Sequence, residues 1–308
     1  MNNDFAIGVD VGGTHITSAV VDLTENRVLE NTLAGRDVDP AAASGEIIRA
    51  WSAAIGESME RSPSPVKGVG MAMPGPFDYA GGVALIKDQP KLRSLYGINV
   101  GEAILKELRQ AVPVRYINDA SAFAVGEAFA GSGKGYEKLM VITLGTGFGS
   151  AFLENGIPVI GRDDVPDGGC VWHLPHGDGI ADDYFSTRWF VGQYEVRTGE
   201  QVKGVKELAE RVETDETARQ LFREFGSGLG AFLAPWFRQF GATALVAGGN
   251  ISRAWDLFGE AFNEALETHG LNLDTKVSQL KEHAALIGSA YLLVDPYWDK
   301  MKDVVPLM

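Results

Sequence analysis

The chain has 308 residues, a formal net charge of −14 and a single cysteine, Cys170. The acidic balance disfavours partners rich in phosphate, such as nucleic acids and anionic membranes, and one cysteine excludes an intramolecular disulfide and a cysteine-rich zinc site. The N-terminus lacks the pattern of a signal peptide, and no run approaches the ~18 apolar residues of a membrane span. These features predict a cytoplasmic protein, and the length predicts about two domains.

The chain up to residue 131 alternates strand-like and helix-like segments, which predicts an α/β fold. The hydrophobic pattern predicts strands at 6–10, 16–22, 26–33, 66–73 and 114–117, and helices at 41–60, 100–110 and 120–131. One strand ends in Pro74-Gly75-Pro76, a rigid loop at the carboxyl end of a strand, where open α/β sheets bind ligands. Gly75 is therefore a candidate binding residue.

The first two strands flank a glycine turn at Gly12-Gly13. We expect these glycines to supply the positive φ that a tight hairpin needs. The backbone N–H groups of such a turn point outward, and no side chain blocks the approach of a phosphate. Asp10 and Thr14 flank the turn and are suited to a water-bound metal ion and a phosphate oxygen.

Asn118 and Asp119 follow a predicted buried strand and open a helix. Asn and Asp are good helix N-caps, and capping alone explains an isolated pair of this kind. Their position after a buried strand also favours a role in ligand binding. The residues alone leave both interpretations open.

A second unit of strand, glycine turn and strand spans residues 139–154 and repeats the design of the first hairpin. Its turn, Gly145-Thr146-Gly147, predicts a second phosphate hairpin and two related halves of the chain. A dinucleotide fingerprint is excluded, because a strand rather than a helix follows these glycines.

The remainder begins with a polar loop up to residue 186 and is then mainly helical, with helices predicted at 182–198, 205–213, 215–240, 252–269 and 283–294. His173 and His176 lie in this loop, but their spacing among glycines and prolines is a weak signal for a metal site. A strand at 244–247 leads into Gly248-Gly249-Asn250 and a helix capped by Ser252. Such a step suits the ribose or phosphates of an adenine nucleotide, and it equally suits close packing.

These motifs together resemble the ROK family (repressors, open reading frames and kinases) of the sugar kinase/actin-like ATPase superfamily. The resemblance runs from the DVGGTH segment at residue 10 to ALIGSAYL at residue 285. It implies an α/β, two-domain actin-like ATPase (ribonuclease H-like) fold with a central cleft. The small α/β domain would comprise residues 1–117 with a C-terminal helix at about 285–308, and the large nucleotide-binding domain residues 118–284.

The resemblance also implies where the substrates bind. ATP would be held by three motifs. The first phosphate motif comprises Asp10, Gly12, Gly13 and Thr14, and the second comprises Gly145, Thr146 and Gly147. The adenosine motif comprises Gly248, Gly249 and Asn250. Mg²⁺ would bridge the phosphates, with Asp10 reaching it through water. The sugar would contact Gly75, Lys91, Asn118, Asp119, Cys170, His173 and Asp182, and Asp119 would be the catalytic base.

The chain departs from the family pattern in the segment that contacts sugar. Gly169-Cys170-Val171-Trp172-His173 stands where the family has Gly-Glu-Ile-Gly-His, so His173 is kept while Cys170 replaces a carboxylate. A thiol cannot accept a charged hydrogen bond from a hydroxyl as Glu does. The cysteine-bearing zinc loop of the family has no counterpart in residues 174–181, so we expect no zinc site. Asp182 matches the carboxylate that follows that loop.

Two basic residues are also unusual. In Pro90-Lys91-Leu92, Lys91 replaces an Asn that contacts sugar in the family, and His15 replaces a Lys, which we interpret as a surface change. Lys91 and Cys170 both make the pocket less anionic, which favours an unusual or acidic polyol as substrate. A Lys91 side chain turned to solvent explains the residue equally well.

The leading prediction is an ATP-dependent sugar kinase that phosphorylates a hexose or related sugar or polyol. A sugar-sensing regulator is disfavoured, because Asp10 leaves no room for a preceding DNA-binding segment and the charge is acidic. A non-catalytic or weakly catalytic sugar-binding protein is motivated by Cys170, but the retained Asp10, Asn118 and Asp119 argue against it. The resemblance also implies a homodimer.

Overall fold

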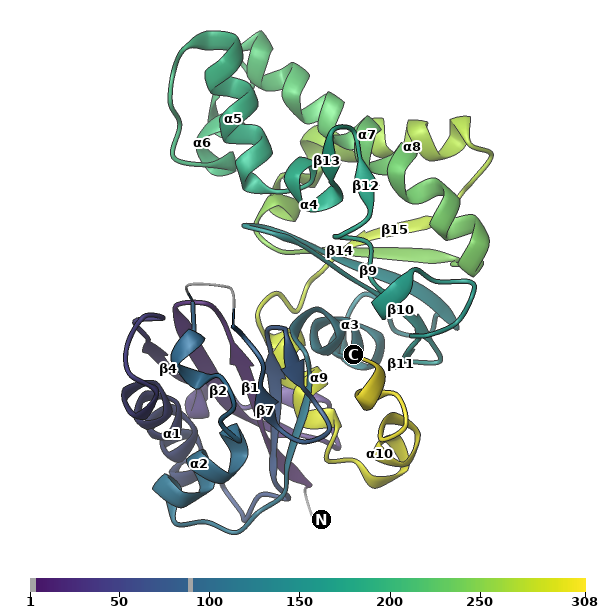
Figure 1. Cartoon of the computed structure of the whole chain (residues 1–308). Helices are drawn as coiled ribbons and strands as arrows, with labels where there is room; N and C mark the ends of the chain where they lie inside the picture. The colour runs from purple at the N-terminus through teal and green to yellow at the C-terminus, as the bar shows by residue number, and fades with distance from the viewer. Residues whose placement is uncertain (1–3, 88–90) are drawn as a thin grey trace. The chain divides into compact units, whose positions relative to one another are not determined.

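The computed structural model describes residues 4–87 and 91–308, which divide into two compact units (Figure 1). Unit 1 comprises Met1–Lys134, Gly156–Pro158 and Glu282–Met308, and unit 2 comprises Gly135–Asn155 and Val159–Lys281. The sequence-based boundary after residue 117 assigned the helix that follows to the second domain. In the structure that helix, α3 (Asp119–Ala130), belongs to unit 1 because it packs on α9 (His283–Tyr291).

The sheet of unit 1 has the strand order β3-β2-β1-β5-β8, with β4 paired to β2. Its strands are β1 (Phe5–Val11), β2 (His15–Asp22), β3 (Arg27–Val28), β4 (Ala34–Asp37), β5 (Val69–Met73) and β8 (Val114–Asn118). The neighbours β1, β5 and β8 are parallel, so their carboxyl ends lie at one edge. Asp10 pairs with Ala72 there, and Met73 pairs with Asn118.

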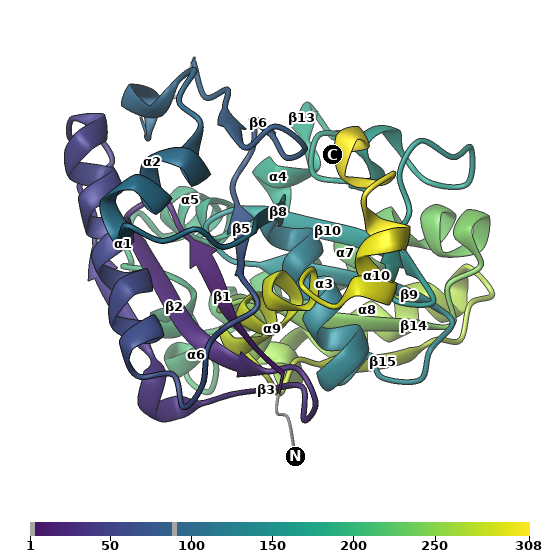
Figure 2. The ribbon, with the colours of Figure 1, turned by 90° about the horizontal axis from the view of Figure 1, so that it is seen from below.

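Helices cover both faces of this sheet. Figure 2 shows α1 (Ser44–Glu60) on one side of β1 and β2 and α9 on the other, and α2 (Val100–Leu108) packs on α1. The remaining elements of unit 1 are η1 (Glu30–Thr32), β6 (Phe77–Asp78), β7 (Val83–Ala84), η2 (Arg93–Leu95), β11 (Ile157–Pro158), α10 (Asp295–Met301) and η5 (Val305–Leu307).

Close backbone contacts hold α9 in unit 1. A Cβ atom on Gly8 of β1 or Gly70 of β5 would overlap carbonyl oxygens of α9. Glycines also allow the approach of the two helices, because a Cβ on Gly126 of α3 or Gly288 of α9 would overlap a carbonyl oxygen of the other helix. The backbone of α9 therefore lies directly against β1, β5 and α3.

Within unit 2, the strands of the second sheet follow the order β10-β9-β14-β15. Their bounds are β9 (Lys138–Leu144), β10 (Phe148–Glu154), β14 (Ala244–Gly248) and β15 (Asp274–Val277). The helices are α4 (Ala181–Tyr184), α5 (Thr187–Thr198), α6 (Val205–Arg211), α7 (Glu216–Phe240) and α8 (Trp255–Thr268), and the short elements are η3 (Asp167–Gly169), β12 (Pro175–His176), β13 (Gly179–Ile180) and η4 (Ile251–Ala254). The core is rich in phenylalanine rings of α5, α7 and α8, among them Phe190, Phe225 and Phe258.

Several predicted elements differ in the structure. The strand predicted at 26–33 is the two-residue β3 followed by a 3-10 turn, and Asn26 has a φ of 52°. The helix predicted at 182–198 is divided at Phe185-Ser186, and β15 was not predicted. Since β15 is an edge strand with a partly exposed, mainly polar sequence, it carries no hydrophobic pattern.

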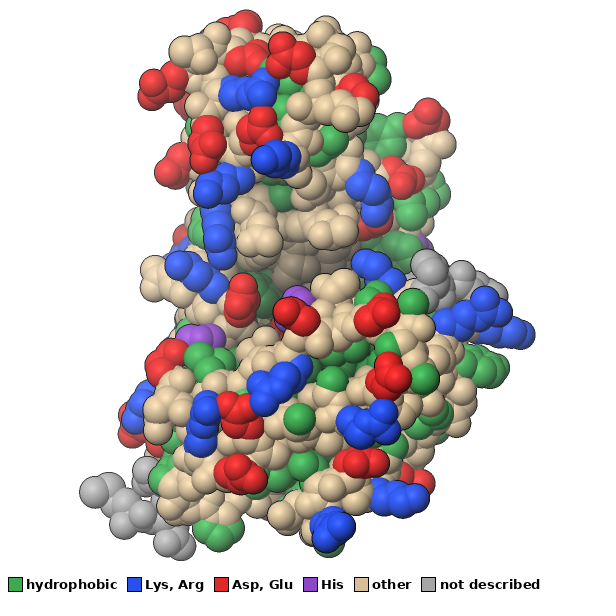
Figure 3. All heavy atoms as spheres, turned by 90° about the vertical axis from the view of Figure 1, so that its left-hand side faces the viewer, with side chains coloured by type: hydrophobic (Ala, Val, Ile, Leu, Met, Phe, Trp, Pro, Cys, Tyr) green, Lys and Arg blue, Asp and Glu red, His purple; other side chains and the backbone are tan. Residues whose placement is uncertain are grey.

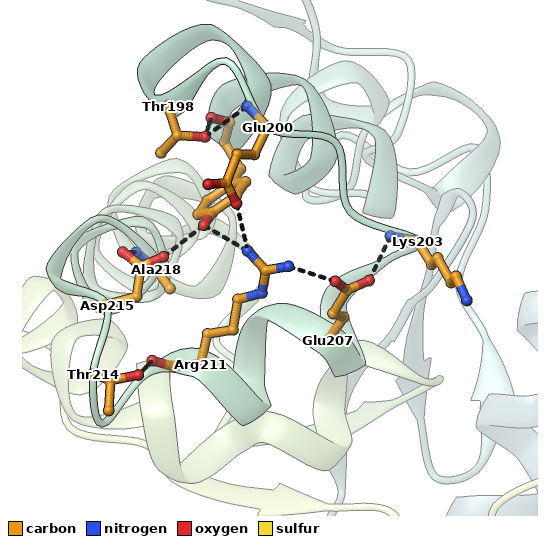
Figure 4. Close-up of polar contacts among 9 residues, drawn as sticks. Thr198, Glu200, Lys203, Glu207, Arg211, Thr214, Asp215 and Ala218 are labelled. Atoms are coloured by element: carbon orange, nitrogen blue, oxygen red, sulfur yellow. Dashed lines mark hydrogen bonds and ion pairs between the residues drawn. The ribbon is translucent and has the colours of Figure 1, made fainter.

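A polar network joins α5, α6 and the start of α7 (Figure 4). The Tyr194 hydroxyl donates to Asp215 Oδ2 at 2.6 Å, and Arg211 Nη1 donates to the Tyr194 oxygen at 2.9 Å. Arg211 also pairs with Glu200 at 3.0 Å and with Glu207 at 2.7 Å. Tyr194 is 2% exposed, so its hydroxyl connects a buried ring to this surface network.

We expect Tyr194→Phe to lower the free energy of unfolding by about 1 kcal/mol, because it removes the hydroxyl that donates to Asp215 and accepts from Arg211. Urea unfolding with an unchanged m-value measures this loss. Tyr96→Phe is the matched control, because Tyr96 is 52% exposed and its hydroxyl has access to water. Equal effects of the two substitutions would show that the network contributes nothing to stability.

Candidate functional site

Predicted site residues of unit 1 gather at the carboxyl edge of β1, β5 and β8. Asp10 is near the end of β1, Gly75 lies in the loop after β5, and Asn118 ends β8. Asp119 is the first residue of α3 and follows Asn118 directly. The parallel topology therefore brings residues together that are more than a hundred positions apart in the sequence.

The carboxylate of Asp10 lies in an acidic environment. Burial raises its pKa from 3.8 to about 7, and the negative charges of Asp119 and Glu282 add to this effect. Sequence analysis did not select Glu282, which precedes α9. Glu282 comes near Asp10 only because the chain returns to unit 1 at residue 282. No local sequence pattern predicts this.

Asn118 caps helix α3, a structural role that Asp119 does not have. Its Oδ1 accepts a hydrogen bond from the Ser121 N–H at 3.2 Å, which caps α3, and its Nδ2 donates to the Tyr79 hydroxyl at 3.3 Å. Tyr79 in turn donates to the carbonyl of Met73 at 3.0 Å. The capping interpretation of Asn118 is therefore confirmed, and its amide group is held in a fixed orientation at the sheet edge.

The carboxylate of Asp119 is available for chemistry. Its Oδ1 accepts a hydrogen bond from the Ala120 N–H at 2.8 Å, and the residue keeps contact with solvent. Desolvation by the surrounding protein is the largest influence on its pKa and raises it above 3.8. A carboxylate with a raised pKa is a stronger base than an ordinary aspartate.

The first glycine turn is closed by a hydrogen bond from the Gly12 N–H to the His15 carbonyl at 2.9 Å. The predicted positive φ is wrong, because neither Gly12 nor Gly13 has one. These glycines provide space instead: a Cβ on Gly12 would lie 2.7 Å from the His15 ring, and one on Gly13 would lie 3.2 Å from the Lys91 side chain. Among the described residues, the amides of Gly13 and Thr14 have no hydrogen-bond partner.

Lys91 lies over this turn, and its Nζ is 3.3 Å from the position that a Gly13 Cβ would occupy. Pro90, which belongs to the same predicted segment, lies outside the described residues. The alternatives for Lys91 were a sugar contact or a side chain turned to solvent. In the structure the Lys91 side chain has a third position, beside the first glycine turn, which is the predicted phosphate site.

The second glycine turn, in unit 2, is tied to α5. Gly145 donates to the Gly147 carbonyl at 3.0 Å, and the Thr187 N–H and hydroxyl donate to the Gly145 carbonyl at 2.8 and 2.9 Å. The amides of Thr146 and Gly147 have no hydrogen-bond partner within the described part of the chain. Exposed amides of this kind are suited to phosphate oxygens, as in the first turn.

Asp182 contacts this second turn. Its Oδ1 accepts a hydrogen bond from the Phe148 N–H at 2.6 Å, and its Oδ2 pairs with Arg188 at 2.5 Å. A Cβ on Gly147 would lie 3.1 Å from Asp182 Oδ1, so a side chain there would press on the Asp182 carboxylate. The predicted sugar contact of Asp182 stays a prediction, and it would compete with these two bonds.

The third glycine turn lies beside the second. Gly249 has a φ of 83°, and a Cβ there would overlap the carbonyl of Leu144, the residue before Gly145. The prediction that Ser252 caps the following helix is wrong: its hydroxyl donates to the Gly249 carbonyl at 2.7 Å, and α8 begins at Trp255 after the 3-10 turn η4. Gly248 and Asn250 flank Gly249, at the end of β14 and before η4.

The loop residues Cys170 and His173 lie close together, with 3.8 Å between Sγ and Nδ1. Burial raises the pKa of Cys170 to about 11, so the thiol is neutral near pH 7. Trp172 between them is 45% exposed. No group of three or more His, Cys, Asp and Glu side chains that could hold a metal ion occurs in residues 4–87 and 91–308.

Two further observations concern the charge of the surface and the apolar character of the helices. On the face shown in Figure 3, basic and acidic side chains are interspersed, and no continuous basic patch is visible. Within the described residues, no helix has the length and apolar character needed to cross a membrane.

Comparisons with known proteins extend over most of the chain. A glucokinase of Streptomyces coelicolor is 28% identical over 324 residues, covering 94% of this chain and 98% of that protein. An N-acetyl-D-glucosamine kinase of Haemophilus influenzae is 26% identical over 305 residues and covers 89% and 93%. A glucokinase of Thermotoga maritima is 28% identical over 159 residues, and there the match spans only about half of each protein, 52% and 47%.

The fold comparison gives a similar result. The crystal structure of a ROK family glucokinase from Streptomyces griseus, in complex with glucose and AMPPNP, is 26% identical with a TM-score of 0.73 and covers 94% of this chain and 98% of that one. This likeness confirms the predicted α/β fold of the actin-like ATPase class. The model of the ROK family matches residues 6–295. This chain therefore belongs to the ROK family, as its glycine turns and its Asn-Asp pair predicted.

Proposed function

We propose that this protein transfers the terminal phosphate of ATP to a hydroxyl group of a hexose or related polyol, with Asp119 as general base. The predicted enzyme class, an ATP-dependent sugar kinase, is confirmed by the full-length kinase relatives. The observation that carries the role of Asp119 is its position at the carboxyl edge of β8, with a raised pKa and contact with solvent.

Asp119 would accept the proton of the attacking hydroxyl. Phosphoryl transfer depends mainly on positioning and charge neutralisation, and a base adds to the rate by removing this proton. The Ala120 N–H holds one carboxylate oxygen, while the Asn118 cap fixes the start of α3 from which Asp119 projects. The residue is exposed, so its carboxylate is accessible to the substrate hydroxyl.

The glycine turns would bind the phosphates of ATP. The amides of Gly13 and Thr14 in unit 1, and those of Thr146 and Gly147 in unit 2, have no partner within the described residues. Gly248, Gly249 and Asn250 would hold the adenosine, since their turn lies against the residue before Gly145.

The charge at Asp10 favours a divalent cation nearby, although the described residues include no group of three or more side chains that could hold one directly. The carboxylate of Asp10 is desolvated and lies near two further negative charges, which raises its pKa, and a cation would relieve that repulsion. Asp10 would reach Mg²⁺ through water, and Mg²⁺ when bound would neutralise charge on the phosphate oxygens. We propose no zinc site.

The sugar would contact Gly75, Asn118 and Asp119 in unit 1. In unit 2, Cys170, His173 and Asp182 are its proposed contacts. A neutral Cys170 thiol offers only a weak hydrogen bond, so we expect sugar affinity to depend more on Asn118 and His173. A homodimer also stays a proposal.

An ADP-release screen over hexoses, hexosamines, ketoses and cyclitols tests this function. Turnover of at least one of these compounds, dependent on Mg²⁺, is the expected result. Measurable sugar binding without turnover of any compound would favour the alternative, a sugar-binding protein without catalytic activity.

The raised pKa of Asp10 predicts a pH dependence of stability. At pH values between 3.8, the ordinary pKa of the Asp10 carboxyl, and about 7, its pKa in the folded protein, the folded state binds a proton that the unfolded state has lost. The contribution of Asp10 to stability is therefore greatest at low pH and declines as pH rises towards 7. In metal-free buffer, we expect the thermal midpoint of Asp10→Asn, measured relative to the original chain, to rise from pH 4.5 to 8. A constant difference over this range would contradict the raised pKa.

A further inference from the structure

We propose that Lys91 binds the terminal phosphate of the nucleotide, together with the free amides of the first glycine turn. This inference rests on the proposed kinase function and assigns one more residue to it. It differs from the sugar contact that the sequence position of Lys91 implies. The juxtaposition of Lys91 with Gly13 in the structure carries it.

The first argument is geometric. The Lys91 Nζ lies 3.3 Å, and its Cδ 3.2 Å, from the position that a Gly13 Cβ would occupy. Gly13 and Thr14 each present an N–H group without a partner among the described residues. Two free amides of the turn and the Lys91 ammonium group beside them provide the donors that a phosphate group binds.

The second argument concerns the charge of Lys91. No ion pair of Lys91 occurs among the described residues, and the side chain is exposed. Asp10 precedes the turn by two residues, and the charges of Asp119 and Glu282 act on it, so these carboxylates would repel a triphosphate. A lysine at the turn offsets this repulsion where the phosphate charge is greatest.

The third argument is that the chain beside Lys91 is held in place. Leu92 is 2% exposed, and its N–H donates to the Pro40 carbonyl at 2.8 Å. Ser94 donates to the Ala42 carbonyl at 2.7 Å. Both bonds attach the segment after Lys91 to the loop between β4 and α1, so less entropy is lost when the lysine binds a ligand.

Equilibrium binding of AMPPNP, AMP and sugar to the intact protein tests this role. We expect Lys91→Met to weaken AMPPNP binding about ten-fold or more, since a charge-assisted hydrogen bond is lost. AMP, which lacks the distal phosphates, should bind both proteins within about two-fold, because its contacts do not include this turn. Lys91→Arg should retain most of the AMPPNP affinity, because it keeps the positive charge.

Lys106→Met is the matched control, because Lys106 is an exposed lysine on α2 without an ion pair among the described residues. It should leave AMPPNP binding unchanged. An unchanged AMPPNP affinity in Lys91→Met would overturn the proposal. A variant that loses affinity only for the sugar that is phosphorylated would overturn it as well. If the unaltered protein turns over a sugar with ATP, the kinase function stands even when the role of Lys91 fails. A protein that binds no AMPPNP would contradict both.

Discussion

Asp119→Asn is expected to lower kcat by about 10²–10⁴-fold, the usual contribution of a positioned general base. The amide cannot accept the proton of the attacking hydroxyl, although it preserves the shape of the side chain. Sugar affinity should fall less than kcat, because Asn118 and the other proposed contacts are retained. Steady-state kinetics with the sugar identified by the ADP-release screen measure both quantities.

Stability distinguishes a catalytic role of Asp119 from a structural one. Since desolvation raises the pKa of Asp119, its charged form is disfavoured in the folded protein. A neutral Asn should therefore leave the thermal midpoint near neutral pH unchanged or raise it, while kcat collapses. Asp303→Asn, at an exposed carboxylate distant in sequence from the turns, is the control and should change neither quantity. Near-normal kcat in Asp119→Asn would contradict the assignment.

The pH dependence of kcat provides a second check on Asp119. The base must be unprotonated to act, so the rate should fall as the pH drops through its pKa. Because that pKa is raised, the fall should occur at higher pH than for an ordinary aspartate. Asp119→Asn should lose this acidic limb in its residual activity.

The positions of the glycine turns could be predicted from sequence because each one lies between two apolar strands. The structure places the first hairpin at β1 and β2 and the second at β9 and β10, close to the predicted bounds. The reason for the glycines could not be predicted. Gly12 and Gly13 make room for the side chains of His15 and Lys91, and the latter comes from a distant segment.

Contacts between distant segments account for most of what the sequence did not predict. The charge of Glu282 acts on Asp10 only because the chain returns to unit 1 after residue 281. Asp182 reaches the Phe148 amide across 34 positions of sequence. A pattern of residue types reports local periodicity, whereas these contacts depend on how separate elements pack.

The close contact between α3 and α9, which also joins distant segments of the chain, predicts a large effect on stability. Gly288→Ala is expected to lower the free energy of unfolding by about 2 kcal/mol or more, although alanine favours helices by about 1 kcal/mol over glycine. The added methyl group would overlap the Ala122 carbonyl oxygen and lie 2.8 Å from the Gly126 nitrogen. Both are backbone atoms, so only a separation of α3 and α9 relieves the overlap.

Gly192→Ala is the matched control, because Gly192 is inside α5 and a Cβ there would have no neighbour within 4 Å. It should stabilise the protein by about 0.5–1 kcal/mol through helix propensity alone. Gly126→Ala should resemble Gly288→Ala, since its Cβ would overlap the Ala284 carbonyl. The double variant should cost less than the sum of the two, because one separation of the helices relieves both overlaps.

The same substitution also tests whether the α3–α9 contact positions the catalytic base. Asp119 is the first residue of α3, so a displacement of that helix from α9 moves the carboxylate relative to Asp10 and the first glycine turn. Small displacements of a catalytic group lower turnover strongly. We therefore expect Gly288→Ala to lower kcat at temperatures where the protein remains folded. A stable Gly288→Ala protein with full activity would show that the two helices are not in the close contact described, and that Asp119 is positioned by the Asn118 cap and β8 alone.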